Sequence, residues 1–275
     1  MTVRPKQWPK NVLVFAAPVA AGKIFHDHSL FKSALAFIAF CLISSVGYIV
    51  NDIRDLERDR GNPKKSKRPL ASGKITTTQA LYVLAVCAIL GIAASLALPL
   101  TFKLVLLLYL ISTLSYSFGL KHQPVVELMI VALGFLLRAL AGGAATGTPI
   151  SRWFLVVASF GSLVVVVAKR LAEAESLVNA DVRPVIRDYP LPFLRFVLTV
   201  SAAVTLTGYS LWAFSLPESR HFGQISLLPL CLGLFRYVWL VEKGSGEVPE
   251  DLLLHDVVML FSGFATAVLL LLSMY

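Results

Sequence analysis

The sequence predicts an all-α polytopic membrane protein, a bundle of about nine transmembrane helices. Of its 275 residues, 57% are hydrophobic and only 15% are charged, whereas a soluble domain has about 25% charged residues. Apolar runs of about 20 residues, the length that crosses a bilayer, recur along the chain. We expect the formal net charge of +9 to reflect loops beside anionic lipid and an anionic substrate, with no nucleic-acid partner.

Nine segments are expected to span the membrane, and the first is short and interrupted by Pro18. They cover residues 10–25, 29–53, 77–98, 101–119, 124–145, 150–171, 191–214, 222–241 and 253–274. Proline breaks a helix, so Pro99 separates the third segment from the fourth, and Gly147 and Pro149 separate the fifth from the sixth. We therefore expect one transmembrane domain over residues 1–275.

A weak internal repeat is indicated by two charged helix ends. The second span continues into 51-NDIRDLERD-59, and the sixth continues into 169-KRLAEAE-175. Four spans separate these two ends, as a duplicated four-helix unit requires. The sequence thus predicts two pseudo-repeated four-helix halves followed by a last helix.

Lysine and arginine are distributed unevenly over the loops. With the N-terminus inside, 17 of the 25 lie in inside segments, five lie in outside segments and three lie within spans. Positively charged loops stay on the cytoplasmic side of a membrane. We therefore expect the long charged loops, and the active site with them, at the cytoplasmic face of the cell membrane.

The strongest chemical signal is the acidic end of the second span. Offsets of three and seven residues place Asp52, Asp55 and Asp59 on one helical face, together with Asn51. The three carboxylates repel one another unless a hard divalent cation binds their oxygen atoms. Mg2+ usually binds one or two carboxylates together with phosphate oxygens. This pattern predicts a Mg2+–phosphate site with these four residues as metal ligands and the three aspartates as catalytic residues.

Simpler explanations exist for this acidic end and for the cationic run that follows it. The aspartates could form a solvated helix end paired with Arg54, Arg58 and Arg60. The run 64-KKSKR-68 suits phosphate, but it could equally bind anionic lipid head groups. Four oxygen donors on one face favour the metal site, and the role of the cationic run stays open.

The pattern NDxxDxxxD, followed by Arg68, Pro69 and Gly73, resembles the first aspartate motif of the UbiA superfamily of intramembrane prenyltransferases. The resemblance extends to the nine-span layout over nearly the whole chain. It implies that Asn51 and the three aspartates bind Mg2+ and a diphosphate at the cytoplasmic end of the bundle.

The sequence departs from this family at the sixth span. Prenyl-transferring members have a second DxxxD motif there, whereas this chain has Lys169, Arg170, Glu173 and Glu175. One acidic and one basic motif suit phosphoribosyl diphosphate, which carries a diphosphate at one end and a phosphate at the other. With the segments 4-RPKQWPKNVLVFAAP-18 and 134-GFLLRALAGG-143, the chain resembles the branch that transfers 5-phosphoribose to decaprenyl phosphate for arabinan cell-wall synthesis. The resemblance implies Mg2+ as cofactor, a polyprenyl phosphate as acceptor and diphosphate as product.

Further polar residues are candidates for binding the substrates. They are Lys10 and Asn11 at the start of the first span, Arg58, Lys67 and Arg68 after the second, Tyr116 and Lys121 near the end of the fourth, Arg138 within the fifth, Lys169, Arg170 and Glu173 in the basic motif, and Arg187 and Tyr189 in the next loop. Two of them have an equally plausible structural role. Arg138 could pair with Glu127, and Lys121 could extend its ammonium to the membrane surface.

Two other functions remain to be distinguished. A prenyltransferase acting on an aromatic acceptor would need the second aspartate motif that this chain lacks. A cation-coupled transporter would have its site near the midplane of the bilayer, whereas the acidic cluster lies at a membrane exit. The sequence leaves the oligomeric state open, including a homo-oligomer.

Overall fold

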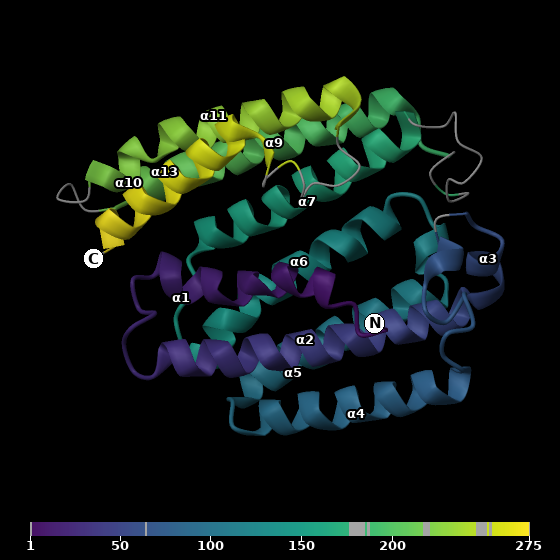
Figure 1. Ribbon diagram of the computed structural model, residues 1–275. Helices are drawn as coiled ribbons and strands as arrows, with labels where there is room; N and C mark the ends of the chain where they lie inside the picture. The colour runs from purple at the N-terminus through teal and green to yellow at the C-terminus, as the bar shows by residue number, and fades with distance from the viewer. Residues whose placement is uncertain are drawn as a thin grey trace. The chain divides into compact units, whose positions relative to one another are not determined.

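The computed structural model describes residues 2–63, 65–175, 185, 188–216, 221–245, 252 and 255–274. Over these residues the chain forms helices and no strand (Figure 1). The long helices are α2 (Ser29–Arg54), α4 (Thr77–Leu96), α5 (Leu100–Phe118), α6 (Val126–Thr146), α7 (Arg152–Glu175), α9 (Leu191–Phe214), α11 (Leu227–Leu240) and α13 (Val257–Met274). The short ones are η1 (Pro5–Phe15), α1 (Ala16–Ala20), α3 (Leu56–Arg60), η2 (Lys65–Lys67), η3 (Leu120–His122), α10 (His221–Ile225) and η5 (Val241–Ser245).

Eight stretches of the described chain are long and apolar enough to cross a membrane, and α10 and α11 belong to one of them. They correspond to the second through ninth predicted segments. Their outer surfaces are apolar, as on α4, where Val86, Ile89 and Leu90 are all more than half exposed. Such faces need lipid around them. The predicted all-α, multi-pass membrane protein is therefore confirmed.

The first predicted span differs from the other eight, because its helix begins earlier and is of another type. The segment forms the 3-10 helix η1 and the short α1, and runs antiparallel to α2. Arg4 pairs with Asp52, and the ring of Phe15 lies 6.0 Å from that of Phe37. A 3-10 helix rises about 2.0 Å per residue against 1.5 Å in an α-helix. Eleven residues of η1 thus cover about 22 Å, the same depth as fifteen residues of α2. The stretched helix explains why the apolar run is short.

The chain forms two compact units. Unit 1 comprises residues 1–19 and 23–149, and unit 2 comprises residues 20–22 and 150–275. Unit 1 contains η1 and the helices through α6, and unit 2 contains α7 through α13. The division falls after α6, one span later than the boundary between the predicted four-helix halves. The internal repeat stays a prediction.

The core of unit 1 forms around α2, which packs against α4, α5, α6 and η1. The ring of Phe40 on α2 lies 6.0 Å from Phe102 and 5.1 Å from Tyr109, both on α5. The backbones of α6 and η1 approach closely at Gly142, where a Cβ atom would lie 1.8 Å from the carbonyl oxygen of Val14. Only glycine allows this approach. The packing keeps η1 against α2 and thereby positions the N-terminal end of η1 beside the acidic end of α2.

Candidate active site

The acidic motif lies where α2 ends and α3 begins. Asp55 leaves the helical conformation, with φ −95° and ψ 7°. The helical hydrogen bonds nevertheless continue, because the Asp55 amide donates to the Asn51 carbonyl at 2.9 Å and the Asp59 amide donates to the Asp55 carbonyl at 2.8 Å. Asp52 and Asp59 are almost fully buried. The acidic motif is thus helical apart from one break at Asp55.

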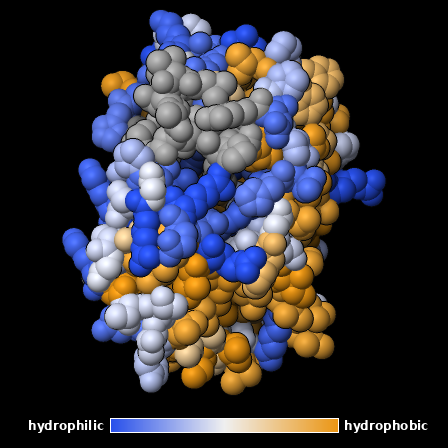
Figure 2. All heavy atoms as spheres, turned by 90° about the vertical axis from the view of Figure 1, so that its right-hand side faces the viewer, coloured by the Kyte–Doolittle hydropathy of each residue, from blue (hydrophilic) through white to orange (hydrophobic). Residues whose placement is uncertain are grey.

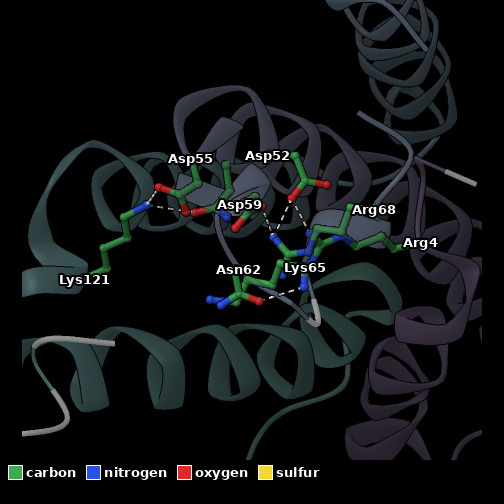
Figure 3. Close-up of polar contacts among 9 residues, drawn as sticks. Arg4, Asp52, Asp55, Asp59, Asn62, Lys65, Arg68 and Lys121 are labelled. Atoms are coloured by element: carbon green, nitrogen blue, oxygen red, sulfur yellow. Dashed lines mark hydrogen bonds and ion pairs between the residues drawn. The ribbon is translucent and has the colours of Figure 1, made fainter. Parts of the chain in front are cut away.

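Arginine side chains from two other segments reach the buried carboxylates (Figure 3). The guanidinium of Arg68 donates to Oδ1 of Asp52 at 3.1 Å and to Oδ2 of Asp59 at 2.5 Å. Arg4 also pairs with Oδ1 of Asp52. A buried carboxylate needs such partners, since desolvation of an unpaired charge is unfavourable.

Lys121 contacts Asn51 and Asp55, the two oxygen donors of the motif that the arginines do not contact. Its ammonium donates to Oδ1 of Asp55 at 2.5 Å and to Oδ1 of Asn51 at 3.4 Å. Lys121 lies in η3, directly after α5, and its side chain is buried. It therefore points at the acidic motif, and its role as a phosphate ligand stays a prediction. Figure 3 shows Lys121 on one side of the aspartates and the two arginines on the other.

Local contacts stabilise the loop after α3 in a conformation in which Arg68 reaches the carboxylates. Oδ1 of the buried Asn62 accepts a hydrogen bond from the amide of Lys65 at 2.7 Å. Leu70 is buried in a cluster with Ile49 and Ala80. Arg58 and Lys67, in contrast, are exposed.

The donor set fits Mg2+ in one particular way. Among the described residues, no three His, Cys, Asp or Glu side chains converge closely enough to hold a metal ion by themselves. The oxygen donors form two groups, Asn51 with Asp55 and Asp52 with Asp59, and each group surrounds a cationic side chain. Two oxygen donors fit a Mg2+ ion that takes its remaining ligands from phosphate and water. The neighbouring cationic side chain repels the metal but can bind the same phosphate.

Arg138 lies in a buried network within unit 1. Its guanidinium donates to Oδ1 of Asn11 at 2.7 Å, to the carbonyl of Gly134 at 2.7 Å and to the hydroxyl of Tyr109 at 2.8 Å. Asn11 in turn donates to Sγ of Cys41 at 3.2 Å. These contacts join η1, α2, α5 and α6. They give Arg138 and Asn11 structural partners, and any substrate contact by either residue stays a prediction.

Lys10 and Tyr116 lie on η1 and α5, and both are half-buried. Figure 2 views the side of the molecule on which α3 lies, and hydrophilic residues are gathered there next to a hydrophobic region.

Unit 2 contains the basic motif at the end of α7. Arg170 is buried and donates to Oε2 of Glu173 at 2.6 Å, while Lys169 is half-buried. Arg195 on α9 donates to Glu175 at 2.7 Å and to Glu242 in η5 at 3.1 Å. Both glutamates of the motif are thus paired with arginine.

The predicted loop residues after α7 are only partly described. Tyr189 is buried and stacks on Phe193, with ring centroids 6.2 Å apart. Arg187 lies outside the described residues.

The structure adds Arg4 to the site, a residue of the N-terminal segment that is not among the predicted site residues. Arg4 and Asp52 are 48 positions apart. One signal could have indicated the contact. A first span antiparallel to the second brings the basic residues before it alongside the acidic residues that end the second.

Comparisons with known proteins show which family the chain resembles. The family model described as "UbiA prenyltransferase family" matches residues 12–272. The decaprenyl-phosphate phosphoribosyltransferase of Mycobacterium tuberculosis is 41% identical over 264 residues, which cover 94% of this chain and 87% of the relative. The enzyme of that name from Corynebacterium glutamicum is 39% identical and covers 99% of this chain and 85% of the relative.

Solved structures show the same fold at lower sequence identity. A UbiA homologue from Archaeoglobus fulgidus bound to DMAPP and Mg2+ superposes with a TM-score of 0.73 at 20% identity, and covers 98% of this chain and 96% of that one. The same homologue bound to GPP and Mg2+ gives a TM-score of 0.74 at 19% identity, with the same coverage of both chains.

Proposed function

Because the chain belongs to the UbiA prenyltransferase family, we propose that it transfers 5-phosphoribose from phosphoribosyl diphosphate to a polyprenyl phosphate and releases diphosphate. The observation that carries this proposal is the pairing of oxygen donors and cations in unit 1. Asp52, Asp55 and Asp59 each contact a basic side chain that suits phosphate. The relatives from Mycobacterium and Corynebacterium bear the name of this activity.

The oxygen donors of the motif would hold Mg2+ together with the donor's diphosphate. Asn51, Asp52, Asp55 and Asp59 supply these oxygens. When bound, the metal neutralises negative charge on the departing diphosphate. Hard oxygen ligands and a phosphate partner are the preferred surroundings of Mg2+ in proteins.

The basic residues of unit 1 would orient the donor. Arg68 presents a planar fork that can hold two phosphate oxygens at once. Lys121 acts as a point charge beside Asp55. Both side chains already lie at the carboxylates, so the diphosphate would be held at the metal ligands. Lys10, Arg58, Lys67 and Tyr116 remain candidate contacts to the donor.

The acceptor needs little chemical activation. A phosphate monoester is anionic near neutral pH, so its oxygen can attack the ribosyl carbon without a strong general base. Attack from the face opposite to the leaving diphosphate inverts the anomeric centre. The residues that bind the donor's other phosphate stay open among the basic candidates Lys10, Lys121, Lys169, Arg170 and Arg187.

The bilayer would supply the acceptor. The polyprenyl tail is apolar and would lie among the lipid-facing helices. The bias of lysine and arginine toward one set of loops supports the cytoplasmic face of the cell membrane as the location of the site. The product would be a precursor of cell-wall arabinan.

Prenyl transfer from a prenyl diphosphate is the second candidate. The structures of the Archaeoglobus fulgidus homologue bound to DMAPP or GPP with Mg2+ favour it. Arg170 and its partner Glu173 argue against it, because they occupy the position of the second aspartate motif.

Parallel assays with two different labelled donors test the proposal. Purified protein in lipid would receive ribose-labelled phosphoribosyl diphosphate with a polyprenyl phosphate, and in parallel a labelled prenyl diphosphate with an aromatic acceptor. We expect label in the lipid product only from the first pair and only with Mg2+. Labelled aromatic product from the second pair alone would establish the second candidate instead.

A further inference from the structure

We infer that Arg4 is an exchangeable counter-ion of the site: it neutralises Asp52 before the donor enters, and it passes to the donor's diphosphate when the metal takes Asp52. This inference rests on the proposed function and deepens it. It makes Arg4 a positioning residue for the diphosphate and couples metal binding to donor binding.

The structure holds Arg4 on Asp52 through contacts made by its neighbours. Oγ of Ser45 on α2 has one proton, which it shares between the carbonyl of Val3 at 2.9 Å and that of Cys41 at 2.7 Å. The indole of Trp8 donates to the same hydroxyl at 3.3 Å. The segment on both sides of Arg4 is therefore anchored to α2. Its backbone does not need Asp52 to stay in place.

The Arg4 backbone adopts a conformation that is unfavourable for a residue with a side chain. Its φ is 48° and its ψ is 62°, in the left-handed region. Residues with a Cβ atom rarely adopt this region. The turn at the start of η1 directs the side chain to Asp52. The guanidinium also lies 5.3 Å from the ring centre of Tyr48, one helical turn before Asp52.

The charges of the cluster balance without a metal. Asp52, Asp55 and Asp59 supply three negative charges, and Arg4, Arg68 and Lys121 supply three positive charges. A divalent cation that binds without diphosphate would be repelled by all three positive side chains, and this repulsion would lower its affinity for the site. A cation that arrives with diphosphate gives these side chains new anionic partners. Metal and diphosphate should therefore bind together much more tightly than either does alone.

Arg4 is the member of this set best suited to move. Arg68 is held at two carboxylates, and Lys121 is buried. Within the described residues Arg4 has one ion pair, to Asp52, whereas Arg68, whose side chain is about equally exposed, has two. The contact with the Tyr48 ring gives the guanidinium a partner that does not depend on Asp52.

Metal binding to the donor-free protein tests this inference. Mn2+ binding to purified full-length protein in lipid would be titrated by electron paramagnetic resonance, with and without inorganic diphosphate. Arg4→Gln removes a positive charge beside Asp52, so its dissociation constant for Mn2+ alone should fall by about fivefold or more. The gain in affinity on adding diphosphate should be smaller than in the natural protein. A purely structural role for Arg4 would weaken metal binding in both conditions.

Arg60→Gln is the matched control. Arg60 lies on α3, is exposed and pairs with Glu57 at 2.9 Å. Arg60→Gln removes the same charge as Arg4→Gln. Its dissociation constants for Mn2+, with and without diphosphate, should equal those of the natural protein. Equal behaviour of Arg4→Gln and Arg60→Gln would overturn the inference. Failure of the natural protein to bind Mn2+ with or without diphosphate would instead overturn the proposed metal-dependent function.

If Arg4→Gln does not fold, chemical modification of the natural protein tests the same inference. Phenylglyoxal modifies accessible arginine, and mass spectrometry reports the modified fraction of Arg4. Mn2+ alone should increase this fraction, because it displaces the guanidinium from Asp52. Mn2+ with diphosphate should reduce it below that level. An unchanged fraction in all three conditions would contradict the exchange.

Discussion

The ammonium of Lys121 donates to the carboxylate of Asp55 at 2.5 Å, although 66 positions separate the two residues. This contact joins the turn after α5 to the acidic end of α2. It places a cation within the predicted metal ligands. The proposed function gives Lys121 a second partner, the diphosphate of the donor.

Removing the Lys121 charge should reduce catalysis while the protein stays folded. For Lys121→Gln we expect kcat/KM for phosphoribosyl diphosphate to fall by about 100-fold, because one charged contact to a phosphate at a partly buried site contributes about 3 kcal/mol. Lys74→Gln is the control, since Lys74 is exposed and its loss should leave the rate unchanged. Equal rates for both variants would exclude Lys121 from donor binding.

Neutralising a metal ligand should reduce turnover more than the loss of the Lys121 charge does. Asp52→Asn and Asp55→Asn keep the shape of each side chain but remove a negative charge, and each should lower kcat by about 1000-fold or more. Glu57→Gln is the control, because Glu57 lies on α3 and is 85% exposed. Steady-state rates at saturating Mg2+ measure the effect. Near-normal turnover in Asp52→Asn would refute the metal role of that residue.

Gly142→Ala should separate η1 from α6. The new Cβ atom would lie 1.8 Å from the carbonyl oxygen of Val14, and two backbones would have to move apart. We expect a loss of about 3 kcal/mol in the free energy of unfolding, measured by thermal unfolding in lipid or detergent. Gly263→Ala on α13 is the matched control, since nothing lies within 4 Å of its Cβ position. That change should be neutral or slightly stabilising. A stable Gly142→Ala protein would show that η1 and α6 are not in close contact.

Arg138 should act on stability more than on turnover. Arg138→Met removes hydrogen bonds to Asn11, Gly134 and Tyr109, and each buried group left unsatisfied costs about 1–3 kcal/mol. We expect a large fall in the unfolding temperature and an unchanged KM for the donor in the protein that stays folded. Tyr109→Phe removes one of the three contacts and should give a smaller fall. A raised KM with normal stability would instead place Arg138 in substrate binding.

The local features of the site were predictable from sequence. The offsets among Asp52, Asp55 and Asp59 lie within about two helical turns, so their gathering at the end of α2 follows from helix periodicity. Their division into one group around Arg68 and one around Lys121 does not. The eight long helices follow from apolar runs long enough to cross a bilayer. Both predictions depend on residues that are close in the chain.

The distant contacts were not predictable in the same way. Arg4 reaches Asp52 because η1 is a 3-10 helix of 11 residues, and hydrophobic periodicity does not reveal that type of helix. Arg138 lies among Asn11, Gly134 and Tyr109 because α5, α6 and η1 pack together. The sequence alone left its role open between substrate contact and an ion pair. Such networks depend on tertiary packing.

The most direct test of the proposed function is phosphorus NMR of one reaction in lipid vesicles. Purified protein would receive phosphoribosyl diphosphate, a polyprenyl phosphate and Mg2+. The proposal predicts a new phosphodiester signal in the lipid and an equal amount of free diphosphate, and neither signal after chelation of Mg2+. Diphosphate release without a phosphodiester, or no reaction until a prenyl diphosphate and an aromatic acceptor are supplied, would contradict it.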